Sequence, residues 1–235
     1  MNQRRWERIT AVAAIATAVL MVAALTTWGN HYYTDPLHKI TNYYVENQHK
    51  ALLSQFLFLL FGLSVLIFGV GLRLVLHRAE GEPHVFSALF FAGTIAVSVW
   101  MMVFASINGG LAAVAAGASP SEIRLIMGIE GYVDQLSFLA IGITVGSAGL
   151  AMLVAHVFAR WIGWLGLASG VLYLVSNVAV LDPNPNGTLA GISNLGMIGS
   201  LLFLIWLVAI AVSLLRRPAT ARTPEAVART EAVPA

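Results

Sequence analysis

The chain has 235 residues, of which 58% are hydrophobic and 10% charged, with a formal net charge of +2 and no cysteine. A soluble domain usually carries about 25% charged residues, so this composition excludes an ordinary soluble fold and indicates a membrane protein. The lack of cysteine excludes disulfides, thiolate metal sites and cysteine nucleophiles. The basic residues stand at the ends of apolar stretches, which is typical of membrane anchoring, and we expect no nucleic-acid partner.

The sequence predicts an all-α, polytopic membrane protein with six transmembrane helices in one bundle. A spanning helix needs about 20 apolar residues, and six stretches meet this requirement: about 9–28, 51–76, 85–107, 132–158, 162–181 and 192–215. The first is longer than the apolar region of a signal peptide, so we expect an uncleaved helix. Residues 1–217 are predicted to be the six-helix domain, and residues 218–235, rich in Ala, Thr, Pro and Glu, a disordered cytoplasmic tail.

A polar and aromatic segment, residues 30–50, separates the first two apolar stretches. Beyond Asp35-Pro36 its apolar residues fall near helical spacing, which predicts a short helix on the membrane surface with tyrosines at headgroup depth. We expect Asp35 to cap this helix and Pro36 to occupy its first turn.

The fourth helix is predicted to be longer than a membrane crossing. Asn108-Gly109-Gly110 is expected to interrupt the third stretch, and Ser119-Pro120-Ser121-Glu122 is a capping box that begins the fourth. Nothing stops that helix before about residue 159, which gives about 60 Å against a hydrocarbon core of about 30 Å. Its first turns are therefore expected to project above the membrane or line a polar vestibule, with a kink or break at Gly128 and Gly131.

The polar breaks alternate in charge, and this alternation predicts the orientation. One side of the predicted topology carries Arg4, Arg5, Arg8, Arg73, Arg78, Arg160, Arg216, Arg217, Arg222 and Arg229. The other side carries Lys39, Lys50 and Arg124. Cytoplasmic loops are enriched in Lys and Arg, so we expect both termini in the cytoplasm.

The clearest candidate ligand site is an acidic pair, Glu130 and Asp134, at the start of the fourth apolar stretch. Spacing i, i+4 places both carboxylates on one helical face, where their charges repel unless a proton is shared or a cation is bound. Gln135, Tyr173 and Asn177 are polar groups that complete a candidate cavity lining, although buried polar residues also serve as hydrogen bonds between helices. The alternative for the acidic pair is hydration in the headgroup layer or pairing with a basic residue.

Two groups of histidines are candidates for metal or haem chemistry. On the side with few basic residues, His31, His38, Glu46 and His49 carry metal-ligating groups, but their spacing matches no standard metal motif. His77, His84 and His156 stand at the ends of the predicted spans on the arginine-rich side, where a pair is a candidate for axial haem ligation. No particular cofactor is implied.

Arg160-Trp161-Ile162-Gly163-Trp164-Leu165-Gly166-Leu167, followed by Gly170, resembles the start of the fifth helix in uncharacterised six-helix bacterial membrane proteins. Asp35-Pro36-Leu37 before a long second helix is similar to such families as well. They are catalogued as domains of unknown function and are abundant in actinobacteria. The resemblance covers about residues 1–217, implies a bacterial inner (plasma) membrane protein, and supplies no activity or site residues.

Three functional hypotheses follow from these observations. The first is a non-enzymatic partner, sensor, or small-ligand- or lipid-binding subunit with an outward-facing polar site. Its expected partner is the bilayer, and other membrane proteins are candidate partners. The second is a small proton- or cation-coupled transporter that uses Glu130 and Asp134. The third is a membrane enzyme or haem protein, although the sequence holds none of the P-loop, G-x-S-x-G or H-E-x-x-H patterns.

Overall fold

The computed structural model describes residues 3–29, 35–181 and 189–217. The tail predicted for residues 218–235 lies outside this range, and so does His31. The helices are α1 (Gln3–Trp28), α2 (Leu37–Glu46), α3 (Gln48–Glu80), α4 (Val85–Val114), α5 (Pro120–Ala155), α6 (Arg160–Ser176) and α7 (Ala190–Arg216), and a 3₁₀ helix, η1 (Asn177–Leu181), extends α6. Six elements are long and apolar enough to cross a membrane, namely α1, α3, α4, α5, α6 with η1, and α7. The described residues contain no strand. The predicted all-α, six-helix membrane fold is thereby confirmed.

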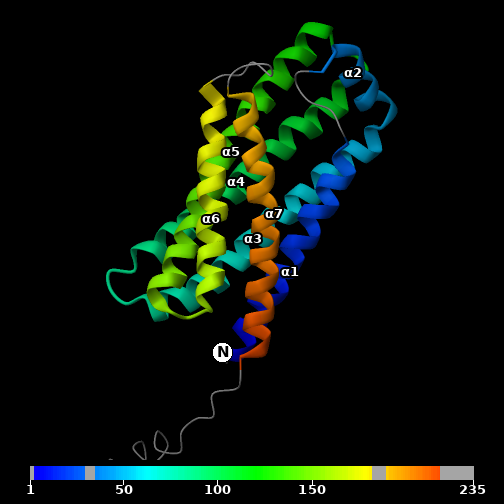
Figure 1. Ribbon diagram of the computed structural model, residues 1–235. Helices are drawn as coiled ribbons and strands as arrows, with labels where there is room; N and C mark the ends of the chain where they lie inside the picture. Colours follow the sequence, from blue (N-terminus) through cyan, green and yellow to red (C-terminus); the bar gives the residue numbers. More distant parts are fainter. Residues whose placement is uncertain (1–2, 30–34, 182–188, 218–235) are drawn as a thin grey trace, which may run out of the picture.

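The six spanning helices form a closed ring in sequence order (Figure 1). Each helix contacts the helices before and after it in the chain, and α7 contacts α1, which closes the ring. Because successive helices run in opposite directions, the start of α1, the α3–α4 and α5–α6 turns and the end of α7 lie at one end, which we call the arginine end. The opposite end carries α2, and we call it the α2 end.

Small residues allow the ring neighbours to approach closely. At the α5–α6 contact, a Cβ added to Gly170 would lie 2.6 Å from the Cα of Gly146, and one added to Gly149 would lie 2.7 Å from the carbonyl oxygen of Gly163. Backbone atoms cannot yield as a flexible side chain can, so this contact requires glycine on both helices. Gly71 meets Thr10 between α3 and α1, and Gly93 meets Thr144 between α4 and α5.

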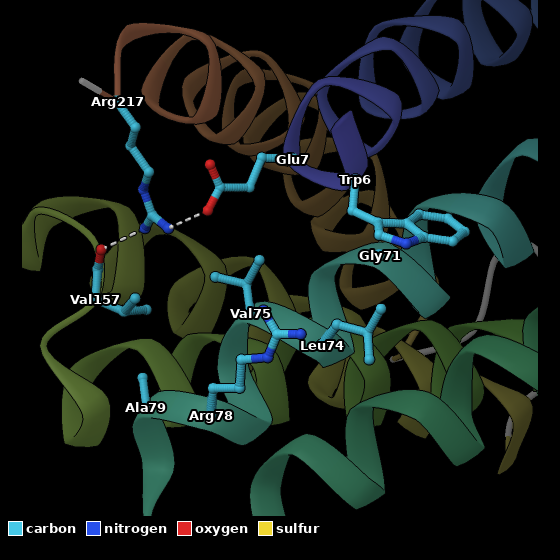
Figure 2. A pocket seen from close by; sticks show the side chains of 9 residues that line it. All are labelled: Trp6, Glu7, Gly71, Leu74, Val75, Arg78, Ala79, Val157 and Arg217. Atoms are coloured by element: carbon cyan, nitrogen blue, oxygen red, sulfur yellow. Dashed lines mark hydrogen bonds and ion pairs between the residues drawn. The ribbon is translucent and has the colours of Figure 1, made fainter. Parts of the chain in front are cut away.

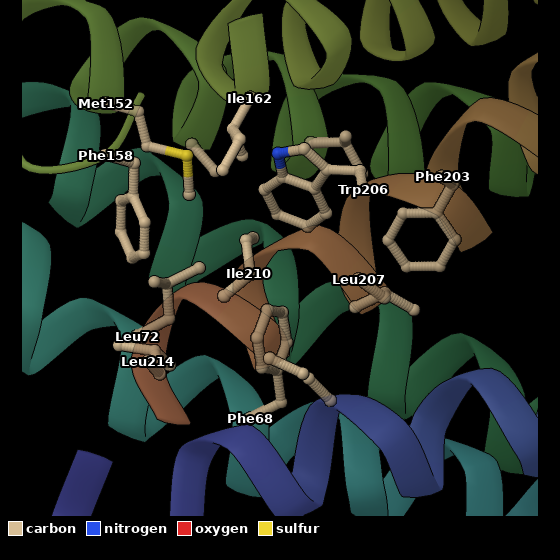
Figure 3. Close-up of a cluster of buried hydrophobic side chains, with 14 of the residues drawn as sticks. Phe68, Leu72, Met152, Phe158, Ile162, Phe203, Trp206, Leu207, Ile210 and Leu214 are labelled. Atoms are coloured by element: carbon tan, nitrogen blue, oxygen red, sulfur yellow. The ribbon is translucent and has the colours of Figure 1, made fainter. Parts of the chain in front are cut away.

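The apolar core is densest toward the arginine end. There Ala11, Ala14 and Ala18 of α1 are buried in one cluster with residues from α3, α4, α5, α6 and α7. Figure 3 shows the contribution of α7, with Leu207, Ile210 and Leu214 beside Phe68 and Leu72 of α3. The side chain of Trp206 packs against α6, since its Nε1 atom would lie 2.7 Å from a Cβ added to Gly166.

A second structural unit stands at the α2 end. Ile40 and Tyr44 of α2 are buried against Leu111 of α4 and against Ile123 and Met127 of α5. At 1.5 Å per residue, the 36 residues of α5 extend about 54 Å, so its first turns pass beyond a hydrocarbon core of about 30 Å. The predicted capping box is present, because Ser119 Oγ accepts from Glu122 N while Glu122 Oε2 accepts from Ser119 N at 2.6 Å.

Three local predictions differ from the structure. Asn108-Gly109-Gly110 does not interrupt α4, which continues to Val114, and α5 is unbroken at Gly128 and Gly131. Burial of Leu111 and Ile123 against α2 continues both helices past glycines that cost only about 1 kcal/mol each. Asp35 does not cap α2; its Oδ1 instead accepts from Lys39 Nζ at 3.0 Å.

Candidate functional site

The ring of helices encloses a central cavity of about 860 Å³. All six spanning helices and η1 contribute side chains to its wall, and it extends from the α2 end to about the middle of the bundle. The cavity exists because each helix packs on its two ring neighbours rather than on a common axis. A volume of this size lies within the range of about 300–1,000 Å³ that is typical of small-molecule sites.

Aromatic side chains form most of the apolar wall. Trp28, Phe58 and Phe104 meet edge to face, with ring centroids 4.9 to 5.6 Å apart. Deeper in the bundle, Phe68 lies 6.0 Å from Trp206 and contacts the ring of Phe90, and these three side chains form the floor. Edge-to-face contacts fix ring orientation, so this part of the cavity has a defined apolar shape.

Polar groups, mainly from α5, line the α2 end of the cavity beside the cluster of Trp28, Phe58 and Phe104. Glu130 and Asp134 both line it, as expected for residues one helical turn apart. Glu130 is buried, with 5% of its surface exposed, and Asp134 is half-buried. Neither carboxylate forms an ion pair with any residue in the described parts of the chain. Acceptor groups therefore face the cavity without a cationic partner from the described residues.

Glu130 also connects the cavity to α2. Its carboxylate interacts with the side chain of Asn108, which is fully buried, and Asn108 Oδ1 accepts from the Tyr44 hydroxyl at 2.9 Å. Burial raises the pKa of Tyr44, and the nearby Glu130 carboxylate raises it further. The Tyr44 hydroxyl thus stays protonated and available as the donor that joins α2 to α4.

Of the other predicted site residues, some line the cavity and some form hydrogen bonds between helices. Gln135 Nε2 donates to the carbonyl oxygen of Ser176 at 2.8 Å, and Asn177 Nδ2 donates to the carbonyl oxygen of Gln135 at 2.7 Å. This exchange joins α5 to the α6–η1 junction. Gln135 and Tyr173 line the cavity, whereas Asn177 is not among its lining residues. The Tyr173 hydroxyl donates to Ser200 Oγ of α7 at 2.8 Å.

Two residues at the site gave no signal in the sequence. Asn108, which contacts Glu130 from behind the cavity wall, stood in a presumed break. Trp100, which lines the cavity, stood within an apolar run, yet its Nε1 donates to the carbonyl oxygen of Val133 at 2.8 Å and joins α4 to α5. The aromatic wall could not be identified, because a phenylalanine in a spanning helix faces lipid or protein equally well by composition. Only the helical phase relative to the polar lining residues would have indicated which rings face inward.

A smaller pocket, of about 210 Å³, lies at the arginine end (Figure 2). Arg217, just after α7, donates to the carbonyl oxygen of Val157 at 2.7 Å and lies 3.7 Å from Glu7 of α1. Its guanidinium also covers the ring of Phe158, 4.7 Å from the centroid. One side chain thus joins the end of α7 to α1 and to the α5–α6 turn.

None of the five histidines that the structure describes lines the central cavity. His38, Glu46 and His49 are exposed at the α2 end, and no three His, Asp or Glu side chains come together as a metal site within the ranges that the structure describes. At the arginine end, the rings of His77 and His84 lie 3.9 Å apart, while His156 ends α5.

Comparisons with known proteins identify one family. No curated protein and no solved structure matches the chain. One family model, described as Domain of unknown function (DUF4386), matches residues 9–211, which include all six spanning segments except the ends of the first and last. This is consistent with the uncharacterised family expected from the sequence. The chain belongs to the DUF4386 family, a domain of unknown function.

Proposed function

We propose that this chain is a non-enzymatic membrane receptor or ligand-carrying subunit that binds an amphipathic molecule in the central cavity. The observation that carries the proposal is that one cavity combines carboxylates at its α2 end with a floor that is apolar and aromatic. Carboxylates from α5 line the α2 end, and aromatic rings line the floor. Ligand sites commonly combine a largely apolar wall with a few convergent polar groups that fix orientation.

The lining favours a ligand whose head donates hydrogen bonds. Glu130 and Asp134 present acceptor oxygens to the cavity and have no ion-pair partner among the described residues. An ammonium head compensates their negative charge and donates up to three hydrogen bonds, and a hydroxyl head donates one. A carboxylate head is repelled. The preferred order of heads is therefore ammonium, then hydroxyl, then carboxylate.

Orientation and location form part of the proposal. The arginine-rich end is placed in the cytoplasm by the positive-inside rule, so the carboxylate end of the cavity faces outward. The membrane is proposed to be the bacterial inner membrane, with residues 1–217 as the transmembrane domain.

The experiment compares three amphiphiles that share a dodecyl chain and carry an ammonium, a hydroxyl or a carboxylate head. The full-length chain is reconstituted in lipid nanodiscs, and the shift in unfolding temperature is measured against probe concentration, because a ligand that binds the native state stabilises it. We expect saturable stabilisation in the order ammonium, hydroxyl, carboxylate. Glu130→Gln with Asp134→Asn should weaken ammonium binding by about tenfold or more, as expected when hydrogen bonds to charged groups are lost.

Glu46→Gln is the matched control, since Glu46 is an exposed carboxylate on α2 outside the cavity lining. This variant should bind all three probes as the unchanged chain does. Lack of saturable stabilisation by any probe would overturn the proposed function. If the double variant still binds the three head groups in the same order of preference, Glu130 and Asp134 do not select the head group, and that part of the proposal is overturned.

A second candidate function is proton- or cation-coupled transport. It is favoured by the position of Glu130 and Asp134 in a cavity rather than among lipid headgroups. The packed core at the arginine end separates this cavity from the other face, so transport requires the buried contact of Ala11, Ala14 and Ala18 to open. The test is uptake of the dodecylammonium probe into liposomes under an imposed pH gradient. Uptake that Glu130→Gln abolishes supports transport, and binding without uptake excludes it.

A further inference from the structure

The contact between α1 and α7, which closes the ring and which we call the α1–α7 seam, is packed differently at its two ends. Toward the arginine end, small α1 side chains at Ala11, Ala14 and Ala18 are buried in the same cluster as Leu207 and Ala211 of α7. Toward the α2 end the two helices separate, as Figure 1 shows for the first (blue) and last (orange) helices. In the same direction along α1, the small side chains are followed by the larger Met21 and Leu25.

Certain side chains on this seam border both the cavity and the outer surface. Leu25 of α1 and Met197 and Leu201 of α7 all line the cavity. Their exposed fractions are 46%, 73% and 59%, respectively. A side chain that lines a cavity and is also exposed stands at the rim of an opening. The cavity therefore opens sideways, through the wall of the ring, between α1 and α7.

The chemistry of this rim fits hydrocarbon rather than water. Beyond Asn194, which lies one turn closer to the start of α7, its lining side chains are all aliphatic or thioether, namely Met21, Leu25, Met197, Leu201 and Leu204. Exposing them to water is unfavourable by about 25 cal/mol per Å², whereas contact with lipid chains carries no such penalty. By contrast, the exposed lining residues Tyr132 and Asn194 are amphipathic or polar.

An opening between two helices is tolerated in a bilayer. The backbone hydrogen bonds of α1 and α7 are satisfied within each helix, so separating the helices leaves no unpaired backbone group facing lipid. Leu25 lies one turn before the end of α1, and Met197 lies two turns into α7, which places the rim in the leaflet at the α2 end. The methionines are flexible and can adapt to a passing chain.

We propose that the ligand of this protein is dissolved in the bilayer and enters sideways from the leaflet at the α2 end, tail first, between Leu25 of α1 and Leu201 of α7. The ligand class is a membrane amphiphile with an aliphatic tail. This inference rests on the proposed binding function and adds the source of the ligand and its route. The tail reaches the floor at Phe68 and Trp206, while the head remains beside Glu130 and Asp134.

The fully buried Trp206 supplies the reporter for the test. The probe is dodecylammonium carrying a terminal bromine, which quenches tryptophan fluorescence at short range. Quenching is followed in nanodiscs containing the full-length chain, and the part of the signal that Trp206→Phe removes belongs to the cavity floor. The sequence has no cysteine, so Leu25→Cys with Leu201→Cys introduces a single pair that a thiol-reactive cross-linker can bridge and a reductant can release.

Bridging the pair should slow both association and dissociation of the probe by at least tenfold, and reduction should restore both rates. The control is Val22→Cys with Val208→Cys treated with the same reagent, because these residues are exposed on the same two helices but do not line the cavity. Its rates should stay unchanged. Leu25→Ala with Leu201→Ala, which removes exposed side chains without touching the core, should raise both rates severalfold.

The outcomes separate the two proposals. Saturable quenching with rates that neither bridging nor the alanine pair alters would overturn the sideways route and leave the binding function intact. Failure of the probe to quench the unmodified chain saturably would instead overturn the binding function itself.

Discussion

Arg217 and Glu7 join the last spanning helix to the first, with the guanidinium nitrogen 3.7 Å from the carboxylate oxygen. The same guanidinium donates to the carbonyl oxygen of Val157 and covers the ring of Phe158. The ring is thus closed at the arginine end by three interactions of one side chain, while the opposite half of the α1–α7 seam stays open.

These three interactions predict that substitution of Arg217 destabilises the chain more than substitution of Glu7. Arg217→Ala removes all of them and should lower the free energy of unfolding by about 1–3 kcal/mol, as expected for the loss of a hydrogen-bonded, partly buried charged group. Glu7→Gln keeps the Val157 and Phe158 contacts of Arg217 and weakens a partly exposed ion pair, so it should lower the free energy of unfolding by no more than about 1 kcal/mol. Thermal unfolding in detergent measures both, and equal effects would contradict the importance of the Val157 and Phe158 contacts.

The α5–α6 contact predicts a severe effect for a single methyl group. Gly170→Ala places a Cβ 2.6 Å from backbone atoms of Gly146, so the two helices must move apart. We expect a loss of about 1–3 kcal/mol, the usual range for overpacking. Gly110→Ala on α4 is the control, because nothing lies within 4 Å of its added Cβ, and it should be neutral or stabilising by up to about 1 kcal/mol. Similar losses for both would show that helix packing at Gly170 is looser than described.

The bond from Tyr44 to Asn108 predicts how α2 is held. Tyr44→Phe leaves the buried Asn108 Oδ1 atom without this donor, which should weaken the attachment of α2 by about 1–3 kcal/mol. Hydrogen exchange of the α2 amides should accelerate while exchange in the middle of α6 stays unchanged. Tyr132→Phe, at an exposed tyrosine of α5, is the control and should leave α2 unaffected. Unchanged exchange in Tyr44→Phe would mean that apolar packing alone holds α2.

Substitution of Asn177 should lower stability without changing ligand binding. Its side chain joins η1 to the backbone of Gln135 but does not line the cavity. Asn177→Ala should therefore lower the free energy of unfolding by about 1 kcal/mol and leave the affinity for dodecylammonium unchanged. Affinity is measured by probe titration in nanodiscs and stability by thermal unfolding. A large loss of affinity without loss of stability would place Asn177 in the ligand site.

The sequence predicted those features of the fold that depend on the bilayer or on local chemistry. Apolar length fixes the number of spanning helices, and the capping box at Ser119 and Glu122 fixes where α5 begins. The packing of α2 was not predictable, because burial of Tyr44 and the continuation of α4 past Gly110 depend on contacts distant in sequence. Local propensities of about 1 kcal/mol are smaller than the burial that opposes them.

The candidate site was predictable in its polar part only. Carboxylates such as Glu130 and Asp134 are costly in contact with lipid, so their inward position follows from their presence in an apolar helix. Asn177 is also a polar residue in an apolar stretch, but its side chain donates to a backbone carbonyl instead of lining the cavity. Composition alone does not distinguish a cavity-lining polar residue from one that joins helices. The aromatic floor and the opening at Leu25 and Leu201 depend on helix rotation and on the divergence of α1 from α7, which no local pattern encodes.

The contact of Arg217 with Glu7 also means that the two ends of the membrane domain are neighbours in space. A short polar linker from residue 217 to the start of α1 would therefore cross little distance and disturb no spanning helix. New chain ends could then be opened at the exposed turn of Gly81 and Glu82, between α3 and α4. A ring in which every helix packs on its two sequence neighbours has no structurally required first helix, and such a circular permutant should retain the cavity and its sideways opening.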